Sequence, residues 1–121
     1  RRWVEVLSRT VLERVPFLAG ADPVCLHNLA LMLRPLACAA GETIIREGEV
    51  GTAMYVVVRG RVTVSDAAGK VLAELGEGAI VGEQSLLHHR PRNATVRAVE
   101  PTDLIALDKA DFDRVLHDYP E

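Results

Sequence analysis

The first part of the chain carries apolar residues at helical spacing. Between residues 2 and 15 they recur every three or four positions, and charged residues fill many of the positions between them. A period near 3.6 places apolar side chains on one face of a helix, so the pattern predicts an amphipathic helix over residues 2–15 that ends at Pro16. The positions that define this face are Val4, Leu7, Val11 and Val15.

A second helix is predicted to begin at Asp22 and Pro23. Aspartate is a favoured N-cap residue, and proline suits the first helical position. The segment VCLHNLALMLR follows. We expect the helix to run through it and to stop before Pro35, because proline disfavours helical backbone in the residue ahead of it. Residues 1–35 are therefore predicted to form a helical N-terminal part.

From Leu36 onward, glycines divide the chain into short β-branched or alternating segments. Turn signals such as Ala68-Gly69 separate them. Many short strands at close spacing are typical of an antiparallel barrel or double-sheet jelly roll and not of a parallel sheet. The fold class predicted for residues 36–108 is thus mainly β, within an α+β chain. The predicted strands cover residues 55–58, 61–65, 70–75, 94–99 and 104–107.

A last helix is predicted within residues 109–121. Asp108 can serve as its N-cap, and Asp111 stands three residues later, where a capping box has a glutamate. Phe112, Val115 and Leu116 supply its apolar face. The expected order is therefore helix, helix, antiparallel β-roll and helix, with one short helix inside the roll after residue 82.

Composition narrows the class of protein. The 121 residues, 49% hydrophobic and 26% charged, suit one globular domain. The formal net charge of -3 argues against a nucleic-acid surface, which is normally basic. No apolar run approaches the roughly 20 residues that span a bilayer. Cys25 and Cys38 are expected to be free thiols in a reducing compartment. The chain begins without methionine and is expected to be part of a longer protein.

Candidate chemistry concentrates in residues 81–96, VGEQSLLHHRPRNATV. Gly82 can adopt backbone conformations closed to other residues. If EQSLLHH forms a short helix, the free amides of Glu83 to Ser85 would attract an anion, and the guanidinium of Arg92 would add a charge and a fork of donors suited to phosphate. Glu83 is then expected to accept a hydrogen bond from a hydroxyl of the same ligand. An anion beside a hydroxyl describes a sugar phosphate or a nucleotide. A Glu83–Arg92 surface ion pair is the simpler alternative.

Catalysis and metal binding are not expected in this segment. Neighbouring His88 and His89 diverge by about 100° on a helix and do not converge on one ion. The His-x-His pair of metal-dependent jelly-roll enzymes is absent from the sequence. Ser85 has no histidine or aspartate partner suggested by the sequence, and a hydroxyl nucleophile without a base is inert. We therefore expect a binding segment with no cofactor and no metal.

The same segment resembles the phosphate-binding cassette of cyclic nucleotide-binding domains. Those cassettes read approximately F-G-E, two small or apolar residues, a variable piece and P-R-x-A-T-V, and GEQSLLHHRPRNATV fits at the expected spacing. Upstream, GETIIREGEVGTAMYVVVRGRVTV resembles the first half of that family's barrel. The resemblance covers roughly residues 24–120. It departs from the family pattern at Val81, where phenylalanine is frequent, and at Asn93, where alanine, serine or threonine is usual.

The resemblance implies a role for each site residue. Arg92 would bind the exocyclic oxygens of a cyclic phosphate, and Glu83 would accept the ribose 2′-hydroxyl. The backbone of residues 82–85 would complete the phosphate cradle. In this family a threonine at the position of Asn93 favours guanine. Asparagine can donate and accept, so base preference stays open, and we favour cAMP over cGMP. The implied ligand-binding set is Gly82, Glu83, Gln84, Ser85, Arg92, Asn93 and Ala94.

The N-terminal segment resembles one branch of the family. RRWVEVLSRTVLERVPFLAGADPVCLHNLALMLRPL is similar to the end of the linker that joins the pore to the sensor in cyclic nucleotide-gated and hyperpolarisation-activated channels. This implies a cytoplasmic, non-enzymatic sensor of a membrane protein, tetrameric in its parent, with the pore and linker helices as partners. The sensor half of a transcription regulator, or a kinase regulatory module, is the alternative. The family's C-terminal lid helix would be incomplete at Glu121, so we expect weak contact with the base.

Overall fold

The computed structural model describes residues 12, 15, 18–88 and 90–118. The helix predicted over residues 2–15 lies largely outside the described residues, as do His89 and residues 119–121. In chain order the elements are α2 (Pro23–Leu31), β1 (Arg34–Cys38), β2 (Thr43–Ile45), β3 (Ala53–Arg59), β4 (Val62–Ser65), β5 (Val71–Leu75), β6 (Ile80–Val81), the 3₁₀ helix η2 (Glu83–Leu86), β7 (Thr95–Ala98), β8 (Thr102–Asp108) and α3 (Lys109–His117).

The strands form two four-stranded antiparallel sheets, in the orders β1-β8-β3-β6 and β2-β7-β4-β5. This is a jelly-roll arrangement, so the predicted mainly β fold is confirmed, as two facing sheets and not as a closed barrel. Each of the five predicted strands overlaps an observed one. Side chains from both sheets fill the space between them, namely Ile45, Val57, Val62, Val81, Val96 and Leu104.

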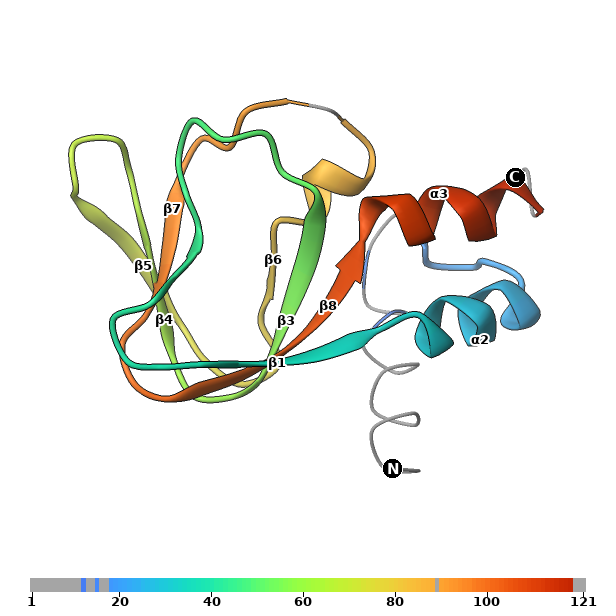
Figure 1. Ribbon diagram of the computed structural model, residues 1–121, viewed down its shortest axis with the longest axis horizontal. Helices are drawn as coiled ribbons and strands as arrows, with labels where there is room; N and C mark the ends of the chain where they lie inside the picture. The colour runs from blue at the N-terminus through green and yellow to red at the C-terminus, as the bar shows by residue number, and fades with distance from the viewer. Residues whose placement is uncertain (1–11, 13–14, 16–17, 89, 119–121) are drawn as a thin grey trace.

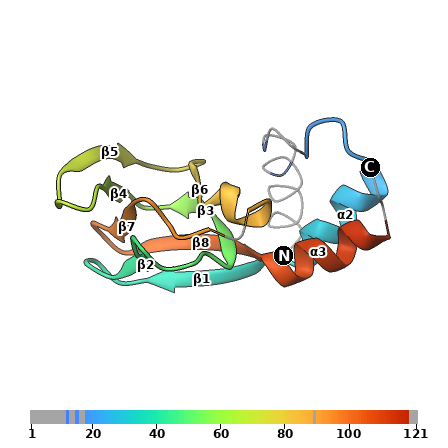
Figure 2. The ribbon, with the colours of Figure 1, turned by 90° about the horizontal axis from the view of Figure 1, so that it is seen from above.

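The helices α2 and α3 lie side by side at one end of the roll (Figures 1 and 2). Strand β3 serves two cores, because successive side chains of a strand point to opposite faces. Val57 belongs to the core between the sheets, whereas Met54 and Val56 pack into a second core with the helices. Phe112 of α3 and Leu86 of η2 belong to that second core. The short helix η2 of the candidate segment is therefore packed against α3.

Helix α2 begins where predicted but ends earlier. Asp22 caps it, because its Oδ1 accepts a hydrogen bond from the amide of Val24 at 2.7 Å. The prediction that the helix continues to Arg34 is wrong, since α2 ends at Leu31 and Arg34 begins β1. Strand β1 pairs with β8 along its whole length. These sheet hydrogen bonds, together with the effect of Pro35 on the residue before it, outweigh the local helix propensity.

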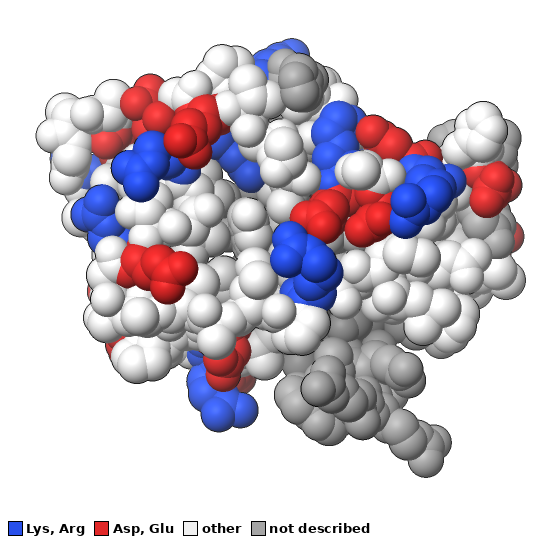
Figure 3. Space-filling view, viewed as in Figure 1, with Lys and Arg blue, Asp and Glu red and all other residues white. Residues whose placement is uncertain are grey.

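Helix α3 has its predicted apolar face but not its predicted cap. Asp108 occupies the N-cap position and makes no side-chain capping hydrogen bond. Its carboxylate instead accepts two hydrogen bonds of 2.8 Å from Nε and Nη2 of Arg34, and these bonds lower the pKa of Asp108. Asp111, expected in the capping box, pairs with Arg114. Figure 3 shows acidic and basic side chains interspersed over the junction of the roll and the helices.

Two further expectations concern the class of protein. The described residues include no helix that is both long and apolar enough to cross a membrane. Cys25 and Cys38 are free thiols, as predicted, and burial raises the pKa of both.

Candidate functional site

The candidate segment bends out of the sheet at Gly82. This residue has φ +77°, in the left-handed region that glycine adopts readily, and the four-residue η2 follows it. The amide of Ser85 donates to the carbonyl oxygen of Gly82 at 3.1 Å. The prediction that this amide is free for an anion is therefore wrong, because the tighter 3₁₀ turn uses it. The amides of Glu83 and Gln84 remain candidates.

The guanidinium of Arg92 lies inside this bend and is partly buried. Its Nη2 donates to the carbonyl of Ala53 at 2.7 Å, and its Nη1 donates to the carbonyl of Gly82 at 3.2 Å. No carboxylate of the described residues pairs with Arg92, and the ion pair with Glu83 does not form. Burial lowers the pKa of Arg92, and Tyr55 partly offsets this. A cation that is partly desolvated without a countercharge favours binding of an anion.

Ser85 shares its acceptors with Arg92. Its Oγ lies 2.7 Å from the carbonyl oxygen of Gly82 and 3.0 Å from that of Ala53, and the residue is 4% exposed. One hydroxyl proton can serve only one of these acceptors at a time. The hydroxyl therefore ties η2 to the start of β3, and its proton is already used in backbone hydrogen bonding.

Two glycines leave the space that the guanidinium occupies. A Cβ atom on Gly51 would lie 2.2 Å from Arg92 Nε, and one on Gly82 would lie 2.5 Å from Nη1. The loop that carries Gly51 is joined to Arg92 by two backbone hydrogen bonds, from Gly48 N to Arg92 O at 2.8 Å and from Arg92 N to Glu49 O at 2.7 Å. No role for Gly51 followed from the sequence. The only sequence feature that points to Gly51 is its spacing from Gly48, just ahead of a predicted strand.

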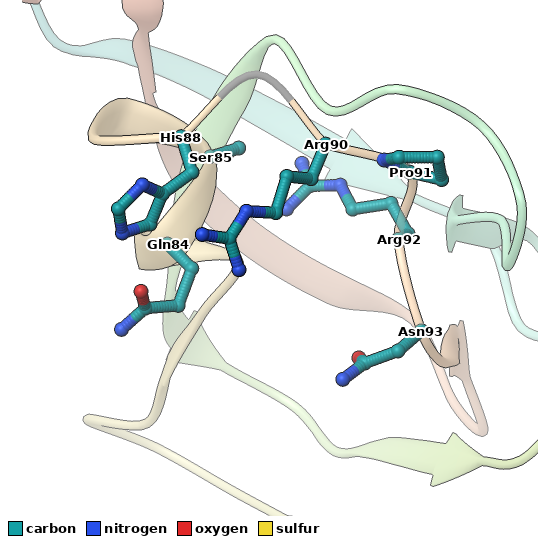
Figure 4. A pocket seen from close by; sticks show the side chains of 7 residues that line it. All are labelled: Gln84, Ser85, His88, Arg90, Pro91, Arg92 and Asn93. Atoms are coloured by element: carbon teal, nitrogen blue, oxygen red, sulfur yellow. The ribbon is translucent and has the colours of Figure 1, made fainter.

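A pocket of about 170 Å³ opens between η2 and the segment that follows it (Figure 4). Four of the predicted site residues line it, namely Gln84, Ser85, Arg92 and Asn93. His88, Arg90 and Pro91 also line it and were not predicted, because exposed loop side chains follow no periodic pattern. In Figure 4, the side chain of Arg90 reaches toward η2 in front of Arg92.

The remaining predicted site residues lie beside the pocket and are not part of its lining. Gly82 takes part through its carbonyl oxygen, which accepts from Arg92. Glu83 is partly buried at the first position of η2, and its carboxylate has no ion-pair partner among the described residues. Ala94 is partly buried next to Asn93.

The pocket can hold a small anion that also carries polar groups. Its charged lining residues, Arg90 and Arg92, are both basic, and Gln84 and Asn93 add side-chain donors and acceptors. The described residues contain no cluster of histidine, cysteine and acidic side chains that could hold a metal ion.

Comparison with known proteins identifies relatives of several kinds. Residues 35–119 match the family model of the cyclic nucleotide-binding domain. The acetyltransferase Pat of Mycolicibacterium smegmatis is 37% identical, over 88% of this chain and 33% of its own. A cAMP-dependent protein kinase regulatory subunit of Schizosaccharomyces pombe is 33% identical, over 92% and 27%. A cyclic nucleotide-gated potassium channel of Rhizobium etli is 36% identical, over 100% and 34%.

A solved structure shares the fold. The structure of cAMP-bound PfPKA-R aligns with a TM-score of 0.75 and 30% identity, and the alignment covers 95% of this chain and 40% of that one. This chain spans between 27% and 34% of the length of the three curated relatives.

Proposed function

This chain belongs to the family of cyclic nucleotide-binding domains, and from this premise we propose that the pocket beside η2 binds cAMP and thereby regulates an attached ion channel. The observation that carries the assignment of the pocket is the environment of Arg92. Its guanidinium is partly buried, has carbonyl oxygens as its hydrogen-bond partners, and forms part of the pocket wall.

In the proposed complex, the ligand contacts Arg92 on one side of the pocket and η2 on the other. Arg92 binds the exocyclic oxygens of the cyclic phosphate through N–H groups that its carbonyl partners leave free, since a guanidinium has five donors. The amides of Glu83 and Gln84 add donors on the side of η2. The carboxylate of Glu83 accepts the ribose 2′-hydroxyl. Asn93 and Ala94 complete the proposed contact surface, and Ser85 holds η2 in place.

The base preference that we propose is adenine over guanine. Asn93 lines the pocket and stands where a threonine would favour guanine in related domains. An asparagine side chain both donates and accepts, so it can satisfy either purine. Preference for cAMP therefore rests on the absence of that threonine.

The effector that we propose is a channel, because one channel relative aligns with the whole chain, including its N-terminal segment. The channel of Rhizobium etli aligns with 100% of this chain, including the N-terminal segment, whereas the kinase regulatory subunit aligns with 92% and the acetyltransferase with 88%. In this proposal the domain is the cytoplasmic sensor of a tetrameric channel, and pore and linker helices are its partners. Regulation is a population shift, whose extent is set by how much better the ligand binds one conformation than the other. A kinase regulatory subunit or an acetyltransferase is the second class of effector.

Calorimetric titration of the full-length protein with cAMP, cGMP and adenosine tests the binding proposal. We expect cAMP to bind more tightly than cGMP, and adenosine, which has no phosphate, to bind at least a hundredfold more weakly than cAMP. Absence of binding by both cyclic nucleotides would overturn the function. Tighter binding of cGMP would overturn the base preference alone.

Ion flux tests the proposed effector. When the full-length protein is reconstituted in lipid vesicles loaded with potassium, potassium should leave the vesicles faster after cAMP is added. Flux that does not respond to a nucleotide that binds would exclude a channel effector.

A further inference from the structure

Lys109, the first residue of α3, joins that helix to η2. Its Nζ donates to the carbonyl oxygen of Leu86 at 3.1 Å and also pairs with the carboxylate of Asp113, whose Oδ2 lies 3.2 Å away. The backbone amide of Lys109 donates to the carbonyl of Thr52 at 2.8 Å. One residue therefore contacts the last residue of η2, the second turn of α3 and the segment that enters β3.

Apolar side chains of η2 and α3 also share one core. Leu86, Phe112 and Val115 are 1%, 2% and 7% exposed within one core cluster. Apolar contact is non-directional, whereas an N–H···O bond fixes both distance and direction. Among the described residues, the hydrogen bond from Lys109 to Leu86 is the polar link between these two helices. The side chain of Lys109 is 25% exposed, so water has limited access to this bond.

We propose that Lys109 is the positioning residue that couples the occupancy of the nucleotide pocket to α3. The inference rests on the proposed function and names the residue through which the same pocket acts on the rest of the domain. The ligand would contact the first residues of η2, and Leu86 is the last residue of that four-residue helix. Because η2 is so short, a shift of its first residues also moves Leu86. The hydrogen bond from Nζ of Lys109 then transmits this shift to the first turn of α3. The coupling is reciprocal, so the position of α3 also sets the affinity for the nucleotide.

The chain offers matched controls for this proposal. Lys70 is the other of the chain's two lysines and lies in the exposed turn between β4 and β5, so Lys70→Met makes the same chemical change away from the link. Asp113→Asn removes the carboxylate partner of Lys109 and leaves the bond to Leu86. Lys109→Arg keeps both the charge and the donors.

Hydrogen–deuterium exchange of the α3 amides, measured on the full-length protein with and without saturating cAMP, tests the coupling. Calorimetry of the same variants supplies the affinities. We expect a ligand-dependent change in α3 exchange in the wild type, Lys70→Met and Asp113→Asn. In Lys109→Met the nucleotide should still bind within about tenfold of the wild-type affinity, while the change in α3 exchange falls by at least half. Lys109→Arg should restore it.

The outcomes separate the coupling from the binding function. Binding of cAMP with the same α3 response in Lys109→Met as in the wild type overturns the coupling and leaves the function standing, as does a wild type that binds cAMP without any α3 response. Failure of the wild type to bind either cyclic nucleotide overturns both. If Lys109→Met does not fold, Lys109→Leu applies the same criterion, because a leucine side chain has no hydrogen-bond donor.

Discussion

Arg92 donates to the carbonyl oxygens of Ala53 and Gly82, and the Ser85 hydroxyl lies within hydrogen-bond distance of the same two oxygens. The shared acceptors join the start of β3 to the residue before η2, and they hold the guanidinium in place without a carboxylate. A phosphate that arrives at this site does not have to displace an ion pair. It can use the guanidinium N–H groups that remain, so the site is arranged for an anion before the anion binds.

Gly51→Ala should weaken nucleotide binding more than it weakens the fold. The new Cβ would overlap Arg92 Nε and Cζ, at 2.2 and 2.3 Å, and the flexible arginine side chain would move away. Gly51 does not have a left-handed φ, so we expect a stability change within about 1 kcal/mol. Loss of charged hydrogen bonds worth about 1.5–3 kcal/mol should raise the Kd for cAMP roughly 10- to 150-fold. Calorimetry and urea unfolding measure the two effects.

Gly76→Ala is the matched control for Gly51→Ala. Gly76 also has no left-handed φ, and its Cβ would lie 3.2 Å from the guanidinium of Arg61, outside the pocket. We expect it to leave the affinity within about twofold of the wild type. Equal losses of affinity in both variants would show that added bulk, and not the position of Arg92, weakens binding.

Arg92→Ala should abolish most of the affinity for cAMP. Truncation of a charge that is partly desolvated and hydrogen-bonded costs about 2–5 kcal/mol of binding free energy, or at least about a 25-fold increase in Kd. Arg59→Ala makes the same change of charge at an exposed side chain and should have little effect. Unchanged cAMP affinity in Arg92→Ala would show that this pocket is not the nucleotide site.

Local sequence pattern predicted five of the observed strands and missed β1, β2 and β6. The run at residues 55–58 marks β3, which extends over Ala53–Arg59, because β-branched residues fill a strand that is buried on both faces. Strands β2 and β6 have three and two residues, too few to display an alternation. Their positions are set by pairing with β7 and β3, which a local pattern does not encode.

The contacts that sequence reasoning missed join residues far apart in the chain. Asp108 was expected to cap α3, but its carboxylate instead pairs with Arg34, which lies 74 positions away in the chain. The absence of a side chain at Gly51 leaves space for Arg92, and backbone hydrogen bonds between the two loops bring these residues close together. The motif did locate Arg92 and Asn93 at the pocket, because the cassette is one continuous segment whose spacing is visible in the sequence.

The Arg34–Asp108 pair should make stability depend on acidic pH. Arg34 holds the pKa of Asp108 below its usual value of 3.8, so the carboxylate stabilises the fold fully above that value. The contribution is lost as the pH falls through the lower pKa of the folded state. Both side chains are partly exposed, at 46% and 32%, so we expect Asp108→Asn to cost about 0.5–1 kcal/mol at pH 7.

Urea unfolding at about pH 7 and about pH 2 checks this sign. The difference in unfolding free energy between the wild type and Asp108→Asn should shrink toward zero in acid. Asp103→Asn is the control, because its pair with Arg59 is 3.9 Å long and more exposed, and it should cost less at neutral pH. A difference that is the same at both pH values would mean that the Asp108 carboxylate is not the stabilising group.

The proposed contact between Glu83 and the ribose can be isolated by changing both partners. A hydrogen bond to a charged group is worth about 1.5–3 kcal/mol, so Glu83→Ala should raise the Kd for cAMP roughly 10- to 150-fold. Glu83→Gln should lose less, because its amide oxygen still accepts from a hydroxyl. Wild-type protein should lose a similar factor for 2′-deoxy-cAMP, which has no hydroxyl to donate.

The double change distinguishes this contact from a general effect of Glu83 on η2. If the carboxylate and the 2′-hydroxyl contact each other, Glu83→Ala should bind 2′-deoxy-cAMP almost as well as the wild type does, because the bond is already absent. Glu100→Ala removes an exposed carboxylate in the turn between β7 and β8 and should leave both affinities unchanged. If Glu83→Ala instead weakens both ligands by the same factor, the carboxylate acts on the position of η2, and the hydroxyl is recognised elsewhere.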